Sequence, residues 1–264
     1  MHYADIKKAD IANGLGVRVS VFVSGCTHHC KNCFNSEAWD FNYGNEFTEN
    51  EINRVIKELD HSYVSGLSVL GGEPLEHVNQ QGLLPLLKRV KEKFPDKNIW
   101  CYSGYTFETD IMGKMYNNWK ETPEILSYID VLVDGKFEED KKDIKLRFRG
   151  SSNQRIIDVK KSLKENFYHG ILLGLLGYKS NWLIKSNAES GIGYSDILVE
   201  VPTNRTGIVI ELKYAEDGDL DAACDKALKQ IEEKDYVAKL KQDGMDNFIK
   251  YGIACFKKVC KVVC

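Results

Sequence analysis

Two patterns of apolar and polar positions alternate along the first 160 residues. Short apolar runs are typical of buried strands, and apolar residues that recur every three or four positions are typical of helices that pack on them. Alternating strand and helix units predict a largely parallel β-sheet. The expected strands cover residues 17–24, 67–70, 99–103 and 129–133, and helical spacing is clearest in residues 52–59 and 83–90.

The first of these helices has a recognisable start. Thr48 followed by Glu51 resembles a capping box, in which each side chain bonds the backbone N–H of the other residue. Pro95 breaks the second helix before the third strand.

Polar segments directly follow each expected strand. A cysteine-rich loop follows the first strand, and Gly71-Gly72-Glu73-Pro74 follows the second. Ser103-Gly104 and Asp134-Gly135 follow the other two. Because ligands bind at the carboxyl ends of parallel strands in α/β proteins, we expect the functional site at this edge.

The pattern changes character near residues 160–166. We therefore expect two α/β domains, residues 1–163 and residues 164–264. The expected elements of the second domain are a helix over 166–176, strands over 182–186, 196–201, 207–214 and 248–263, and a long helix over 220–240.

Composition narrows the class of protein. The 264 residues are 43% apolar, which is enough to fill more than one core. The net charge is −3 and neither half is basic, which disfavours general binding to phosphate backbones. The longest apolar run, residues 171–176, is far short of a membrane span, and residues 1–14 lack the features of a secretory signal. We expect a soluble, cytoplasmic protein.

Eight cysteines in such a chain are expected to be thiols or metal ligands rather than disulfides. Only Cys26, Cys30 and Cys33 cluster at ligand spacing. Cys255, Cys260 and Cys264 lie in a terminal strand-like stretch, where we expect plain thiols.

The three clustered cysteines predict an iron-sulfur cluster. Three thiolates leave one iron of a four-iron cluster open to a ligand from a substrate. The alternative is a zinc site, which usually takes four protein ligands from paired knuckles. No second knuckle follows, although His28 or His29 offers a fourth ligand.

The motifs together resemble a known family. The spacing Cys26-x-x-x-Cys30-x-x-Cys33 followed by Gly-Gly-Glu-Pro is similar to that of radical S-adenosylmethionine enzymes. Further phrases resemble the activating proteins of anaerobic ribonucleoside-triphosphate reductases over about residues 1–160. These are Asn13-Gly14, Phe22-Val-Ser-Gly-Cys26, Val133-Asp-Gly-Lys-Phe137 and Arg149-Gly-Ser-Ser-Asn-Gln154.

The resemblance implies a fold and a reaction. The fold is an open partial (β/α) barrel of the radical S-adenosylmethionine type. The cofactors are a 4Fe-4S cluster and S-adenosylmethionine, which is cleaved reductively to a 5′-deoxyadenosyl radical. The radical removes a hydrogen atom from a glycine of the partner reductase, and a flavodoxin-like protein donates the electron.

The resemblance also implies roles for individual residues. Gly71 and Gly72 let the backbone approach the methionine moiety, and Glu73 or its neighbouring carbonyls accept from the ammonium group. Asn32 and Phe34 lie near the adenine, although Phe34 is equally compatible with an ordinary core position. The residues implied for the ribose hydroxyls and the methionine carboxylate are Ser103, Gly104, Asp134 and Lys136.

The second domain carries a different motif. Asp196 lies in one expected strand and Glu211-Leu-Lys213 in the next, where residues two apart share a face. Two carboxylates suit Mg²⁺, and a lysine beside them positions a water or a phosphate. The arrangement resembles the PD-(D/E)xK nuclease superfamily, and Gln230 on the following helix is expected to face the same site.

Two alternatives to the activating enzyme remain. In the first, the chain is a metal-dependent nuclease whose cluster is structural. In the second, the second domain is a binding module that brings the first domain to a partner. Nucleic acid is expected as a partner only through the second domain.

Overall fold

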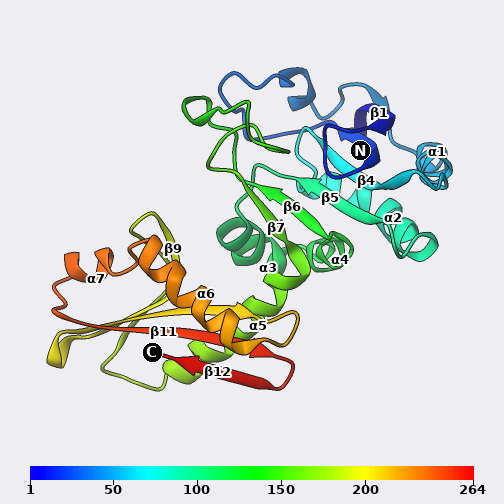
Figure 1. Ribbon diagram of the computed structural model, residues 1–264. Helices are drawn as coiled ribbons and strands as arrows, with labels where there is room; N and C mark the ends of the chain where they lie inside the picture. The colour runs from blue at the N-terminus through cyan, green and yellow to red at the C-terminus, as the bar shows by residue number, and fades with distance from the viewer. The chain divides into compact units, whose positions relative to one another are not determined.

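The computed structural model describes residues 1–264, and the chain divides into two compact units, Met1–Lys160 and Lys161–Cys264. Each unit is a mixed α/β structure built on one mixed sheet (Figure 1).

The sheet of the first unit has seven strands in the order β3-β1-β2-β4-β5-β6-β7. The central strands β2, β4, β5 and β6 run parallel, as the sequence predicts, and antiparallel strands flank them on both sides. The strands are β1 (His2–Asp10), β2 (Val17–Val23), β3 (Asn45–Glu46), β4 (Val64–Gly71), β5 (Asn98–Tyr102), β6 (Val131–Asp134) and β7 (Arg155–Asp158).

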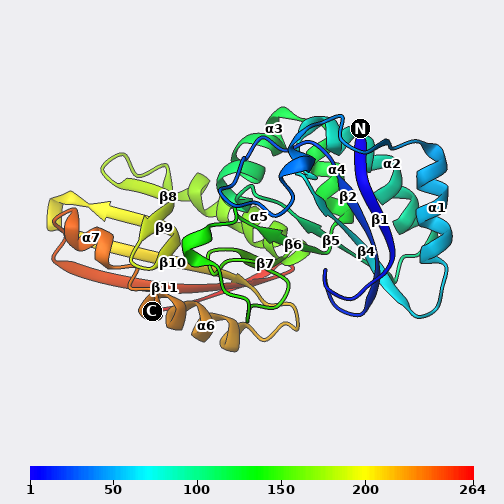
Figure 2. The same cartoon turned by 90° about the horizontal axis from the view of Figure 1, so that it is seen from above.

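Helices α1 (Glu49–Leu59), α2 (His77–Lys93) and α4 (Glu121–Tyr128) lie along one face of this sheet (Figures 1 and 2). The predicted capping box is confirmed, because Glu51 accepts from the N–H of Thr48 at 3.0 Å while the Thr48 hydroxyl accepts from Asn50. Shorter helices are η1 (Ser36–Trp39), the π-helix η2 (Phe107–Met115), α3 (Tyr116–Asn118) and η3 (Glu139–Lys141).

The first strand was not expected from the sequence. Strand β1 pairs with β2, but the register shifts between Tyr3 and Asp5 and again between Lys7 and Asp10. These irregularities interrupt the period-two alternation of buried and exposed side chains, so the segment has no strand pattern.

The other face of the sheet holds a fully buried arginine, Arg18 of β2. Burial lowers the pKa of its guanidinium to about 10, so the group stays charged at neutral pH. All of its hydrogen-bond acceptors are neutral, and they tie β2 to β4 and β5. They are Ser68 Oγ at 2.6 Å, the carbonyls of Leu67 at 2.6 Å, Leu15 at 3.1 Å and Asn98 at 3.1 Å, and Asn98 Oδ1 at 2.8 Å.

The second unit has a five-stranded sheet in the order β12-β11-β10-β9-β8, in which only β10 and β11 are parallel. Helix α6 runs along β10 and β11 (Figure 2). The elements are α5 (Val159–Leu176), β8 (Leu183–Ser190), β9 (Gly193–Val201), η4 (Pro202–Asn204), β10 (Thr206–Tyr214), α6 (Leu220–Glu233), α7 (Ala238–Gln242), β11 (Asn247–Phe256) and β12 (Val259–Val263).

The predicted residue ranges of two elements in this unit were wrong, because each range contains two elements. The helix over 220–240 is two helices, because Asp235 adopts a left-handed φ of 49° between α6 and α7. The strand over 248–263 is a hairpin, because Lys257 adopts a left-handed φ of 52° between β11 and β12.

The expectation of plain thiols was also wrong for two cysteines. Cys255 and Cys260 form a disulfide. They lie directly opposite one another in the β11–β12 register, with their Cα atoms 4.2 Å apart, a pairing that only the hairpin creates.

None of the helices combines the length with the apolar composition that crossing a lipid bilayer requires.

We predict that Arg18→Leu loosens the first unit. Five hydrogen bonds disappear, and buried acceptors on β4 and β5 are left unpaired, at a cost of about 2–4 kcal/mol. Amide hydrogen exchange in peptides from β2, β4 and β5 should accelerate. The exposed Arg54→Leu is the matched control, and equal exchange in both variants would contradict this role for Arg18.

Candidate functional site

Cys26, Cys30 and Cys33 lie on the loop that follows β2, and all three are free thiols. The N–H of Cys33 donates to the carbonyl of Cys30 at 3.1 Å. His29 and Asn32 adopt left-handed φ values of 49° and 56°. These turns make the loop wind back on itself between the cysteines.

Burial governs the state of these thiols. Burial, together with the negative charges of Glu73 and Glu76, raises the pKa of Cys26 to about 11. Burial also raises the pKa of Cys30, although a backbone hydrogen bond from Phe137 and the charge of Lys136 favour its thiolate. Iron would replace the thiol protons, since only thiolates bind it.

The number and chemistry of the thiols fit an iron-sulfur cluster. Each thiolate of such a cluster binds a different iron, whereas a zinc site usually takes four protein ligands. The donor set of three free thiols on one loop therefore suits a four-iron cluster with one iron left open.

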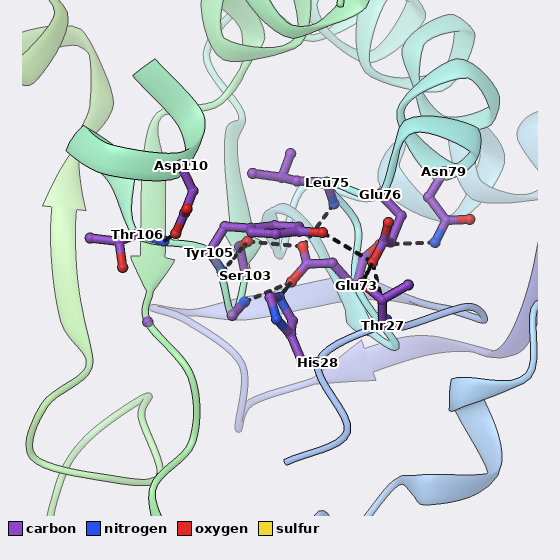
Figure 3. A network of polar contacts seen from close by, with 12 residues as sticks. Thr27, His28, Glu73, Leu75, Glu76, Asn79, Ser103, Tyr105, Thr106 and Asp110 are labelled. Atoms are coloured by element: carbon purple, nitrogen blue, oxygen red, sulfur yellow. Dashed lines mark hydrogen bonds and ion pairs between the residues drawn. The ribbon is translucent and has the colours of Figure 1, made fainter. Parts of the chain in front are cut away.

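The cysteine loop is held in place by the carboxylate of Glu73, which is completely buried (Figure 3). Its Oε2 accepts from His28 Nε2 at 2.9 Å and from the N–H of Gly104 at 2.7 Å. Its Oε1 accepts from Ser103 Oγ at 2.9 Å and from the N–H of Leu75 at 2.8 Å. One side chain thus joins the loops that follow β2, β4 and β5.

A second carboxylate, Glu76, supports the same loops (Figure 3). It accepts from the N–H of Thr27 at 3.1 Å and from the hydroxyl of Tyr105 at 3.1 Å. The rings of His28 and Tyr105 also pack edge to face, with their centroids 4.3 Å apart. A Cβ at Gly104 would come within 2.4 Å of His28, so glycine is required there for His28 to reach Glu73.

Gly71 and Gly72 are needed for packing of the chain on itself. Gly71 has φ +111°, and a Cβ there would lie 2.6 Å from the carbonyl oxygen of Val23. A Cβ at Gly72 would lie 2.6 Å from the carbonyl oxygen of Gly25. The space beside both glycines is therefore filled by the backbone that leads into the cysteine loop.

Ser103 and Asp134, which the sequence suggests as ligand contacts, are buried and bonded within the protein. The Ser103 hydroxyl donates to Glu73 and accepts from the N–H of Tyr105 at 3.1 Å. The Asp134 carboxylate accepts from the N–H of Phe107 at 2.9 Å and from Arg155 Nε at 3.0 Å. Both side chains fix the loops after β5 and β6.

Three other expected contacts are open to solvent. Lys136 is exposed and lies near Cys30, and Asn32 is also exposed. The Phe34 side chain is 99% exposed, which makes the alternative of a core phenylalanine wrong.

In the second unit, the structure brings together the residues that the sequence singled out. Lys213 Nζ lies 2.7 Å from Glu211 Oε1, and Gln230 of α6 donates to the same oxygen. Asp196 of β9 accepts from the N–H of Leu212 at 2.7 Å. The other carboxylate oxygen of Glu211, Oε2, is buried without a hydrogen-bond partner.

Burial raises the pKa of two carboxyl groups in this part of the second unit. Burial, followed by the charge of Asp196, raises the pKa of Glu211 to about 7. Sequence reasoning missed Glu165 of α5, whose Oε1 accepts from the N–H of Tyr214 at 2.9 Å and whose pKa is raised by burial. The expected helix began at residue 166, so nothing marked Glu165 as part of the site.

Sequence comparison links each unit to a family. The family described as 4Fe-4S single cluster domain matches residues 12–157, and the PD-(D/E)XK nuclease superfamily matches residues 163–263.

Several curated relatives carry the name anaerobic ribonucleoside-triphosphate reductase-activating protein. The one from Pasteurella multocida (strain Pm70) is 42% identical over 161 residues, covering 59% of this chain and 96% of the relative. That of Enterobacteria phage T4 is 40% identical, covering 59% of this chain and 93% of the relative. That of Escherichia coli (strain K12) is 38% identical, covering 58% of this chain and 96% of the relative.

We predict that Glu73→Gln destabilises the first unit by about 2–3 kcal/mol. Both carboxylate oxygens of Glu73 now accept hydrogen bonds, and the amide nitrogen of glutamine would face two of those donors without being able to accept from them. Thermal unfolding of the metal-free protein should show a lower transition temperature. Iron retained after anaerobic reconstitution should also fall, because the cysteine loop loses its anchor. The exposed Glu46→Gln is the control, and a Glu73 variant that melts and retains iron like this control would refute the anchoring role.

Proposed function

We propose a course for the reaction of this protein and roles for its residues. The chain belongs to the family of anaerobic ribonucleoside-triphosphate reductase-activating proteins. The protein is an enzyme that activates an anaerobic ribonucleoside-triphosphate reductase, and the reductase is its partner. The observation that carries this assignment is coverage: the matched relatives align over nearly their whole length, at about 40% identity.

The finer fold we propose for the first unit is an open partial (β/α) barrel of the radical S-adenosylmethionine type. The run of parallel strands β2, β4, β5 and β6, with helices between them, supports it. We place the domain boundary near residue 163, close to the division at Lys160.

The proposed cofactors are a 4Fe-4S cluster held by Cys26, Cys30 and Cys33, and S-adenosylmethionine at the open iron. A cluster bound there would supply the electron for reductive cleavage of S-adenosylmethionine, the chemistry by which a hydrogen atom would be removed from a glycine of the reductase. A reduced flavodoxin-like protein is the proposed electron donor.

The chain's own residues bind and orient S-adenosylmethionine. Lys136, exposed beside Cys30, suits the methionine carboxylate. Backbone groups of residues 71–73 suit the ammonium group, since the Glu73 carboxylate already has four donors. Asn32 and Phe34 offer an exposed amide and an exposed ring to the adenine.

Ser103 and Asp134 are proposed to act by holding the loops that carry these groups. Their buried hydrogen bonds leave the ribose contact to the backbone around Gly104.

We predict that Cys30→Ala abolishes reductive cleavage of S-adenosylmethionine, because an iron loses its thiolate. Anaerobic protein incubated with S-adenosylmethionine and a reductant should yield methionine and 5′-deoxyadenosine, measured by chromatography, and this variant should yield neither. Cys264→Ala, which removes an exposed free thiol at the chain's end, should leave the yield unchanged. Undiminished product from the Cys30 variant would exclude the proposed cluster.

A second candidate function is metal-dependent nuclease activity in the second unit. The buried Glu211 Oε2 without a partner is what favours it, because a cation would satisfy that oxygen. Asp196 and Glu211 would hold Mg²⁺, with Lys213 close to the reacting phosphate. The binding-module alternative needs no cation, so the two differ in their dependence on Mg²⁺.

We predict that any cleavage of DNA by this chain requires Mg²⁺ and falls at least about a hundredfold in Glu211→Ala. Gel analysis of plasmid and linear DNA measures it, with the exposed Glu233→Ala as control. Cleavage that persists in the Glu211 variant would assign the activity elsewhere, and no cleavage by the wild type would leave the binding module as the better description.

A further inference from the structure

The segment Arg149-Gly-Ser-Ser-Asn-Gln154 has no part in the proposed binding of S-adenosylmethionine, yet three of its side chains bond the same neighbouring turn. It leads directly into β7, which pairs antiparallel with β6 so that Arg155 lies opposite Asp134. The segment therefore lies against residues 135–138, the turn that follows β6.

Three side chains of the segment bond the backbone of that turn. Gln154 Nε2 donates to the carbonyl of Gly135 at 3.0 Å, and Asn153 Nδ2 donates to the carbonyl of Lys136 at 2.8 Å. The Ser151 hydroxyl accepts from the N–H of Glu138 at 3.2 Å. Polar groups of the turn's backbone are thus fixed on both sides of Lys136 and Phe137.

The segment is itself stiff enough to act as a support. Gln154 Oε1 accepts from the N–H groups of Gly150 at 2.8 Å and Ser151 at 3.2 Å. Arg149 Nη1 donates to the carbonyl of Gln154 at 2.7 Å, closing the loop on itself. A Cβ at Gly150 would lie 3.1 Å from the Phe137 ring, so glycine lets the turn pack closely on its support.

The supported turn meets the cysteine loop. The positive charge of Lys136 favours the thiolate of Cys30, so the turn lies close to the cysteine loop. Groups around a metal site orient its ligands, so the placement of the turn matters for the site.

We propose that Asn153 and Gln154 are positioning residues, which hold the 135–138 turn so that Lys136 meets the carboxylate of S-adenosylmethionine. The proposal rests on the proposed function, since it assumes that Lys136 binds this carboxylate. Asn153 and Gln154 act only through the turn and touch neither cofactor.

The test measures affinity for S-adenosylmethionine by calorimetry on anaerobic, cluster-loaded protein. Asn153→Ala should bind roughly tenfold more weakly than the wild type, because Lys136 is no longer held in place. The neighbouring exposed Ser152→Ala should bind like the wild type. Lys136→Met should bind weakly, and the double variant Asn153→Ala/Lys136→Met should bind no more weakly than Lys136→Met alone.

Thermal unfolding of the same variants separates positioning from plain destabilisation. A merely structural asparagine would lower the melting temperature and leave the affinity per folded molecule unchanged.

The outcomes separate the positioning role of Asn153 from the binding role of Lys136. If Lys136→Met weakens binding and Asn153→Ala does not, the positioning role is overturned and the proposed function stands. Additive losses in the double variant overturn it equally. If the wild type does not bind S-adenosylmethionine, or Lys136→Met binds normally, the proposed carboxylate contact fails and the positioning role fails with it.

Discussion

The buried carboxylate of Glu73 is the constraint on which the first unit's site depends. A fully buried charge is tolerated only where hydrogen bonds replace its hydration, and Glu73 has four donors. These donors come from loops after three different strands. The position of the cysteine loop, the turn at Gly71-Gly72 and the loop at Ser103-Gly104 are therefore set together, and glycines at 72 and 104 provide the close approaches that this meeting requires.

Much of this unit follows from the sequence, because its local signals agree with its topology. The parallel strands, the capping box at Thr48 and the gathering of polar segments at strand ends all have short-range patterns. The partners of Glu73 do not, since His28 and Ser103 lie 45 and 30 residues away along the chain. The sequence therefore indicated Glu73 or its neighbouring carbonyls as a ligand contact, whereas the fold uses the Glu73 carboxylate internally.

The second unit shows the same division between local and long-range information. The period-two alternation of side chains along a strand predicted that Glu211 and Lys213 share one face of the sheet. In the structure, Lys213 Nζ lies 2.7 Å from Glu211 Oε1. Glu165 joins them from a helix whose start the pattern did not mark, and Cys255 meets Cys260 through a hairpin turn at a left-handed lysine. Left-handed turns at residues other than glycine leave little trace in a sequence, so the elements on either side of them were merged.

Electron paramagnetic resonance tests most directly whether this chain makes a glycine-centred radical on its reductase partner. Anaerobic, cluster-loaded protein is mixed with the reductase, S-adenosylmethionine and a reductant, and the spectrum is recorded after freezing. We predict the doublet of a glycine radical, which is absent when S-adenosylmethionine is left out. A spectrum without that radical, from protein whose cluster is shown to be loaded and reduced, would contradict the account.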